Sequence, residues 1–119
     1  MQQIIITGNL GRDPEMRYTP EGKAVCAFSV AVKQGDKTIW FRVSAWEKQA
    51  ENCNAYLKKG SKVLVIGRLQ ADANGQPRTY ETKDGKHAAS FEVTAGSVEF
   101  LTPKGEGAAA AEQDDNTPF

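Results

Sequence analysis

The residues best suited to chemistry in this sequence gather in Thr38–Trp46, which holds both tryptophans of the chain. Successive side chains of a β-strand point to opposite faces. One face of this segment is apolar and suits a core: Ile39, Phe41, Val43 and Ala45. The other face places Trp40 and Trp46 on either side of Arg42. Aromatic rings stack on bases and arginine binds phosphate, so this face indicates single-stranded nucleic acid. Alternatively, both tryptophans pack beneath a helix or loop.

A second pairing of a basic with an aromatic residue occurs in Arg78-Thr79-Tyr80. We expect it on a hairpin that can lie over the same face. Further basic residues could line a path for phosphates, although each one alone is more typical of a solvated surface: Arg12, Arg17, Lys33, Lys48, Lys59, Lys62, Arg68, Lys83 and Lys86.

No catalytic or metal-binding constellation can be assembled from these residues. His87 is the only histidine, and Cys26 and Cys53 are the only cysteines, so neither a zinc site nor a disulfide framework is indicated. Both cysteines are expected in the core without a redox role. The glycine motifs GxxxxGK[ST] and GxGxxG are absent. We therefore expect no enzyme activity, no metal and no cofactor.

The net charge of zero hides an uneven distribution. Residues 1–102 hold 14 basic and 11 acidic residues, a net charge of +3, whereas residues 103–119 hold one basic and four acidic residues, a net charge of −3. The second segment cannot bury apolar surface, so we predict a domain at 1–102 and a disordered acidic tail at 103–119. The longest aliphatic run, Val63–Ile66, is too short for a membrane helix, and nothing indicates export. A cytoplasmic protein without a membrane segment is expected.

Apolar alternation and turn residues predict mostly strands. We expect them at Gln3–Leu10, Lys23–Lys33, Lys37–Trp46, Lys62–Leu69, and in a hairpin of Arg78–Thr82 with Ala88–Ala95. Between the third and fourth strands, a stripe recurs at helical spacing: Trp46, Ala50, Cys53 and Leu57. Lys58, Lys59 and Gly60 then predict the end of that helix. A change of apolar parity after Gly96 predicts a bulge.

This order of elements predicts an all-β fold, namely an OB-fold: a five-stranded Greek-key barrel with one helix between strands three and four. A disordered C-terminal tail follows it. Small sandwiches share these cues and stay an alternative on the pattern alone.

Several segments resemble bacterial single-stranded DNA-binding proteins. They are Gly8–Val25, Trp40–Val43, Tyr56–Val63 and the ending Asp114–Phe119. The resemblance covers residues 1–101 and the last six residues. It implies an OB-fold, usually a homotetramer, that coats single-stranded DNA during replication, repair and recombination in the cytoplasm, at the nucleoid and replication fork.

The resemblance also implies roles for individual residues. Stacking positions are implied at Trp40, Trp46 and Tyr80. Basic positions near the DNA path are implied at Arg17, Arg42, Lys48, Lys59 and Arg78. A tip that recruits replication and repair proteins is implied at Asp114, Asp115, Asn116, Thr117, Pro118 and Phe119. A merely solubilising acidic tail is the alternative for that segment.

Two loops and the tail depart from many members of the family. The turn Gln34–Lys37 is very short and lacks a further stacking aromatic residue, Ala71–Pro77 looks inserted, and the tail is short. The first strand is apolar on both faces, with Ile4 and Ile6 against Ile5, which indicates either a subunit interface or a strand covered within the monomer. Sequence-independent binding of single strands is the leading function. A module that mainly binds other replication proteins is the alternative.

Overall fold

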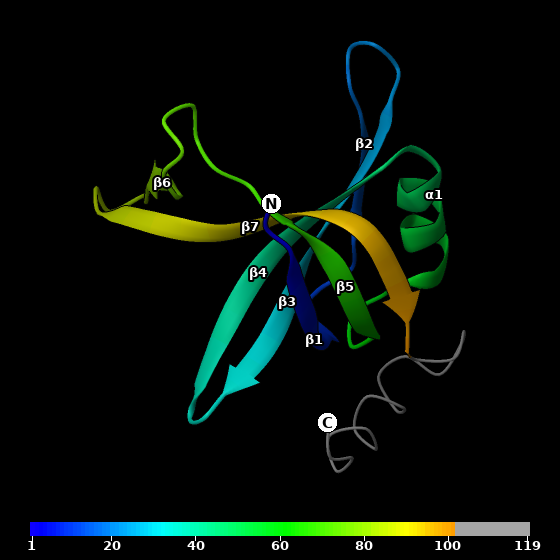
Figure 1. Ribbon diagram of the computed structural model, residues 1–119, viewed down its shortest axis with the longest axis horizontal. Helices are drawn as coiled ribbons and strands as arrows, with labels where there is room; N and C mark the ends of the chain where they lie inside the picture. The colour runs from blue at the N-terminus through cyan, green and yellow to red at the C-terminus, as the bar shows by residue number, and fades with distance from the viewer. Residues whose placement is uncertain (102–119) are drawn as a thin grey trace.

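The structure is a computed structural model, which describes residues 1–101 (Figure 1). Within these residues, seven strands and one helix follow one another. Their bounds are β1 Ile4–Leu10, β2 Glu15–Tyr18, β3 Ala24–Gln34, β4 Lys37–Trp46, α1 Glu47–Tyr56, β5 Lys62–Leu69, β6 Arg78–Glu81 and β7 His87–Phe100. The predicted bounds of β4 and β5 are confirmed. The strand β1 starts one residue later than predicted, and β3 differs by one residue at both ends. In the predicted hairpin, β6 ends one residue earlier, and β7 extends beyond Ala95 to Phe100.

Five of the strands close into a barrel. Their hydrogen-bonded order is β1-β5-β7-β4-β3, and a short pairing of β1 with β3 joins the two ends. The β4–β7 pair is parallel, whereas the pairs β1–β3, β1–β5, β3–β4 and β5–β7 are antiparallel. The helix α1 connects the third and fourth barrel strands, β4 and β5. The predicted OB-fold is therefore confirmed.

The core lies inside this barrel, and valine is its commonest residue. Val30, Val43, Val65 and Val93 come from β3, β4, β5 and β7, and all are fully buried. Because each strand turns alternate side chains inward, four different strands deliver β-branched residues to one place. The helix α1 adds Ala50 and Cys53, both fully buried.

Both cysteines belong to this core, as the sequence predicts. Cys26 and Cys53 are free and fully buried. Burial raises the pKa of the Cys26 thiol to about 11. Burial, with a smaller contribution from Cys26, raises the pKa of Cys53 to about 12. The two thiols therefore stay protonated near neutral pH, which makes them poor nucleophiles.

The helix ends earlier than its sequence indicates. Lys58 and Lys59 were expected in its last turn, but α1 stops at Tyr56, and Leu57 is already extended with φ −93° and ψ 149°. The Ser61 hydroxyl accepts the Lys58 N–H at 3.0 Å, and Ser61 N–H donates to the Lys58 carbonyl at 2.9 Å. A turn closed by Ser61 thus replaces the final helical bonds.

The predicted bulge at Gly96 is present. In the pairing of β5 with β7, Ile66 lies opposite Ser97 while Gly67 lies opposite Ala95, so Gly96 is the extra residue. A Cβ atom on Gly67 would lie 2.2 Å from the Thr94 carbonyl oxygen, so the strands can approach this closely only at glycine. The bulge shifts the inward parity and brings Val98 opposite Val65.

The strand β2 was not foreseen from the sequence. Glu15–Tyr18 pairs with Ala24–Ala27 of β3 at the margin of the sheet, and its side chains are mostly exposed. Two hairpins project from the barrel, one made by β3 and β4 and the other by β6 and β7 (Figure 1). They extend the sheet beyond the closed core.

The remaining expectations from the sequence concern the membrane and the tail. Among residues 1–101, the helix α1 has ten residues and is too short to cross a membrane. The segment predicted as an acidic tail, 103–119, lies outside the described residues.

Candidate nucleic-acid interface

The outer face of β4 carries the residues that the sequence singled out. Trp40 is 51% exposed and Trp46 is 40% exposed, while Val43 and Ala45 on the opposite face are fully buried. Arg42 is exposed between the two tryptophans. Among residues 1–101, neither tryptophan is buried beneath a helix or loop, which was the alternative that the sequence left open. Trp46 follows Trp40 by six positions, which corresponds to about 20 Å of backbone along β4.

The neighbouring strand β3 carries only small side chains beside these rings. Its outward residues lie directly opposite those of β4: Ala31 opposite Trp40, Ser29 opposite Arg42, Ala27 opposite Ser44, and Val25 opposite Trp46. Paired residues across two strands lie on the same face, and the strands are about 4.8 Å apart. Because these partners are small, no large side chain of β3 covers the indole rings.

Each tryptophan borders a pocket. Trp40 lines one of about 280 Å³ together with Gly11, Arg12 and Ser29. Trp46 lines another of about 550 Å³, whose other lining residues are Thr19, Pro20, Glu21, Lys23 and Glu47. Flat ligand groups could therefore meet an indole ring at both ends of this face.

The junction of β4 with α1 fixes the place of Trp46. This residue is still extended, with φ −119° and ψ 148°, so it belongs to the strand and not to the helical stripe. Glu47 follows with φ 56°, in the left-handed region that residues other than glycine rarely adopt. That conformation makes the chain change abruptly from strand to helix and leaves the indole on the outer face of the sheet. The local strain is of the kind found at functional sites.

The face continues across β7 onto the β6–β7 hairpin. In the parallel pairing, Arg42 lies beside Glu92 and Ser44 beside Thr94. Arg78 lies opposite Ser90, and Tyr80 opposite Ala88, so these two side chains share the same face. Tyr80 is 55% exposed.

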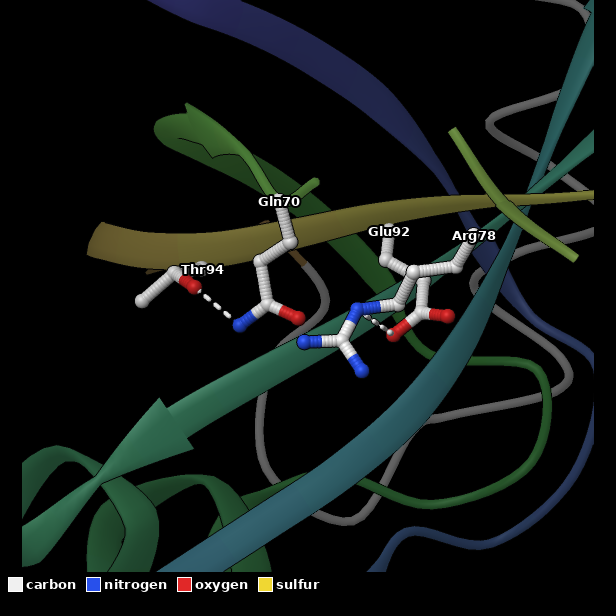
Figure 2. A network of polar contacts seen from close by, with 4 residues as sticks. All are labelled: Gln70, Arg78, Glu92 and Thr94. Carbon is white, nitrogen blue, oxygen red and sulfur yellow. Dashed lines mark hydrogen bonds and ion pairs between the residues drawn. The ribbon is translucent and has the colours of Figure 1, made fainter. Parts of the chain in front are cut away.

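A polar network on this face ties β6, and Gln70 directly after β5, to β7 (Figure 2). Gln70 Nε2 donates a hydrogen bond to Thr94 Oγ1. Arg78 Nε lies 4.0 Å from Glu92 Oε1. Gln70 N–H also donates to the Glu92 carbonyl at 2.8 Å, which holds the start of the loop against β7. The network gives the projecting hairpin a defined attachment to the barrel.

The remaining residues predicted for the site divide into two groups. Arg17 of β2 lies opposite Val25, which itself lies opposite Trp46, so Arg17 shares the face about 10 Å from Trp46. Lys48 lies in the first turn of α1, and Lys59 follows that helix; neither belongs to the rows of paired residues. Lys59 N–H donates to Asp13 Oδ1 at 2.8 Å, beside the loop with Gly11 and Arg12. The predicted tip, 114–119, lies outside the described residues.

Some members of the face were missed in the set predicted from the sequence. Arg12, which the sequence named among the further basic residues, borders the Trp40 pocket, while Gln70, Glu92 and Thr94, which form the polar network, were not foreseen. Only the pairing of strands distant in sequence brings the latter three together, and local patterns do not reveal it. Phe91 is also exposed but lies beside Phe41, on the opposite face, where the two ring centres are 5.6 Å apart.

Comparisons with known proteins agree with this geometry. Residues 1–101 match the model of the single-strand binding protein family. The chain belongs to this family. It is 45% identical over 114 residues to a single-stranded DNA-binding protein of Bacillus cereus, covering 90% of this chain and 64% of that protein. A single-stranded DNA-binding protein of Neisseria meningitidis is 35% identical over 120 residues, covering 93% of this chain and 66% of that protein.

Solved structures of the family have the same fold. The wild-type single-stranded DNA binding protein of Thermus aquaticus superposes with a TM-score of 0.66 at 36% identity. The match covers 86% of this chain and 41% of that one. This family member therefore spans less than two thirds of the length of the Bacillus relative and less than half of the Thermus chain.

The two unusual loops of this family member have defined structures. The β3–β4 connection consists of Gly35 and Asp36 alone. The loop that looked inserted folds around Asp72, whose Oδ1 accepts the N–H groups of Asn74 and Gln76, both at 2.9 Å. Among residues 1–101, no group of three or more metal-ligating side chains is present.

Gly11 provides a test of how Trp40 is positioned. A Cβ atom on Gly11 would lie 2.5 Å from Cζ3 of Trp40, so an alanine there must displace the ring. We expect Gly11→Ala to change the near-ultraviolet circular dichroism and the fluorescence of Trp40, read in a Trp46→Phe background. Gly96→Ala is the control, because its Cβ would meet the Ile66 carbonyl oxygen at 3.4 Å, an ordinary contact. Equal spectra for both variants would contradict this packing.

Proposed function

We propose that this chain binds single-stranded DNA without regard to sequence, and that it acts by binding and not by catalysis. The observation that carries the proposal is a continuous outer face over β4, β7 and β6. It exposes three aromatic rings, those of Trp40, Trp46 and Tyr80, with Arg42 and Arg78 among them. The names of the curated relatives support the same ligand.

The chemistry of this face suits a single strand. Unpaired bases offer flat rings that stack on aromatic side chains, and every base has such a ring, so stacking tolerates any sequence. Arginine side chains between the rings can neutralise the phosphates that connect those bases. The small side chains of β3 beside Trp40 and Trp46 leave both indole rings accessible. A duplex also carries phosphates, but its bases are already stacked on one another and leave no free face for these rings.

We further propose the finer roles that family membership suggests. The domain of residues 1–102 coats and protects single strands during DNA replication, repair and recombination. Its place of action is the cytoplasm, at the nucleoid. Arg17, Lys48 and Lys59 extend the cationic border of the path beyond the central face.

The principal prediction concerns stacking. Trp40→Ala and Trp46→Ala should each weaken binding of oligo-dT by about 1–3 kcal/mol, a range obtained in part from single-strand binding proteins of this kind. Because both rings are 40% exposed or more, the melting temperature should change little. The measurement is a titration of oligo-dT at several salt concentrations. The logarithm of the binding constant should fall linearly with the logarithm of the salt concentration, with a slope of about −0.7 per neutralised phosphate. Wild-type affinity in both variants would contradict the proposal.

We also propose a homotetramer built partly through the outer face of β1. Ile5 is 61% exposed there and lies opposite Ile66 of β5, so residues 1–101 leave this face uncovered. Burial of such a residue between subunits removes apolar surface from water. Ile5→Glu should reduce the mass found by sedimentation equilibrium, while Ile5→Val should preserve it. A wild-type monomer at micromolar concentration would exclude the tetramer.

The last proposal of this group is that Asp114–Phe119 recruits replication and repair proteins. Pro118 restricts the backbone before Phe119, which lowers the ordering cost on binding, and Asp114 and Asp115 add charge. Deletion of Phe119 should abolish the capture of partners from a lysate and leave oligo-dT affinity unchanged. Capture of the same proteins by the deletion variant would refute this role.

A further inference from the structure

Glu92 occupies an unexpected place for an acidic residue. It is an acidic side chain on the face that also holds Trp40 and Arg42, in the row where β7 pairs with β4. Arg42 lies beside it in the parallel pairing, with strands about 4.8 Å apart. On a surface that attracts phosphate, a carboxylate in the middle repels the ligand.

Arg78 is the closest charged partner of this carboxylate among the described residues. Its Nε lies 4.0 Å from Glu92 Oε1 (Figure 2). The Gln70 side-chain amide is directed to Thr94 and does not donate to Glu92. The side chain of Arg78 is 52% exposed and that of Glu92 is 20% exposed. An ion pair that is open to water in this way is weak.

We propose that Glu92 competes with phosphate for Arg78. In the free protein, the Glu92 carboxylate pairs with Arg78, and a phosphate of the bound strand must displace it. This inference rests on the proposed binding of single-stranded DNA. The ion pair with Glu92 keeps Arg78 close to the path of the single strand. The Glu92 carboxylate and a phosphate of the strand then compete for the Arg78 guanidinium. The carboxylate of Glu92 therefore limits affinity and reduces the net release of counterions.

The variant that tests the competition is Glu92→Gln, which keeps the shape of the side chain and removes its charge. We expect oligo-dT to bind about two- to fivefold more tightly at low salt, the range of a weak surface ion pair. The salt slope should steepen by up to about 0.7 unit, because one arginine is no longer neutralised internally. If Glu92→Gln lowers the melting temperature, Glu92→Thr is used in its place, because threonine has a high propensity for β-strands.

Glu81→Gln is the matched control. Glu81 lies on the same hairpin, three residues after Arg78, and alternation places it on the opposite face from Tyr80. Its removal changes the net charge by the same amount. A gain in affinity that is larger for Glu92→Gln than for Glu81→Gln supports the inference, whereas equal gains show a general charge effect and overturn it.

A double-mutant cycle with Arg78→Gln identifies the route. In that background, Glu92→Gln should give little further gain, because the cation for which Glu92 competes is gone. An undiminished gain would overturn the role of Arg78. If the wild type binds oligo-dT and Trp40→Ala weakens it, but Glu92→Gln has no effect, the inference fails and the proposed function stands. If the wild type does not bind oligo-dT, the proposed function itself fails.

Discussion

The two-residue period of β4 is the constraint on which the rest of this structure depends. The same ten residues that turn Val43 and Ala45 into the core must turn Trp40, Arg42 and Trp46 outward. A slip of one residue would bury the arginine and expose the valine, which is costly on both counts. The packed core therefore holds the binding residues in register, although they contribute little to that core themselves.

Closure of the barrel makes a surface out of this one strand. The strand β4 has β3 on one side and β7 on the other, so its outer face continues in both directions. On the β3 side, Phe28 and Val30 fill the interior, whereas the alternate residues are small and keep the surface low. On the β7 side, the hairpin with β6 raises Tyr80 and Arg78 on the same face. The surface is therefore flat on the β3 side and raised on the β7 side, and a flexible chain can follow such a shape.

Strong local patterns made much of this fold predictable. The bounds of β4 and β5 follow from apolar alternation, and the bulge at Gly96 follows from a break in that alternation. The strand β2 could not be predicted, since it is held by pairing with β3 and its own side chains are mostly exposed. The end of α1 was wrong by several residues, because the Ser61 hydroxyl decides it from outside the helix.

The site divides in the same way. Trp40 and Arg42 share a strand, so their common face could be predicted from their spacing. Glu92 lies beside Arg42 only because β7 pairs with β4 in parallel, and about fifty residues of chain separate these partners. Tertiary pairing of this kind leaves no mark in a local pattern. The resemblance to a family supplied stacking and basic positions, but nothing in it pointed to an acidic residue among them.

The balance of charge on this face follows from its exposed rings. Three exposed aromatic side chains without charge would favour association between copies of the chain. Arg42 between the tryptophans makes two such faces repel each other, which opposes association between copies of the chain. The same charge attracts a polyanion, so one residue both disfavours self-association and favours the ligand. Glu92 then sets how strong that attraction becomes. A face that binds a polyanion and must also release it needs both cationic groups and a limit on its affinity, and the pairing of β4 with β7 places Arg42 and Glu92 side by side.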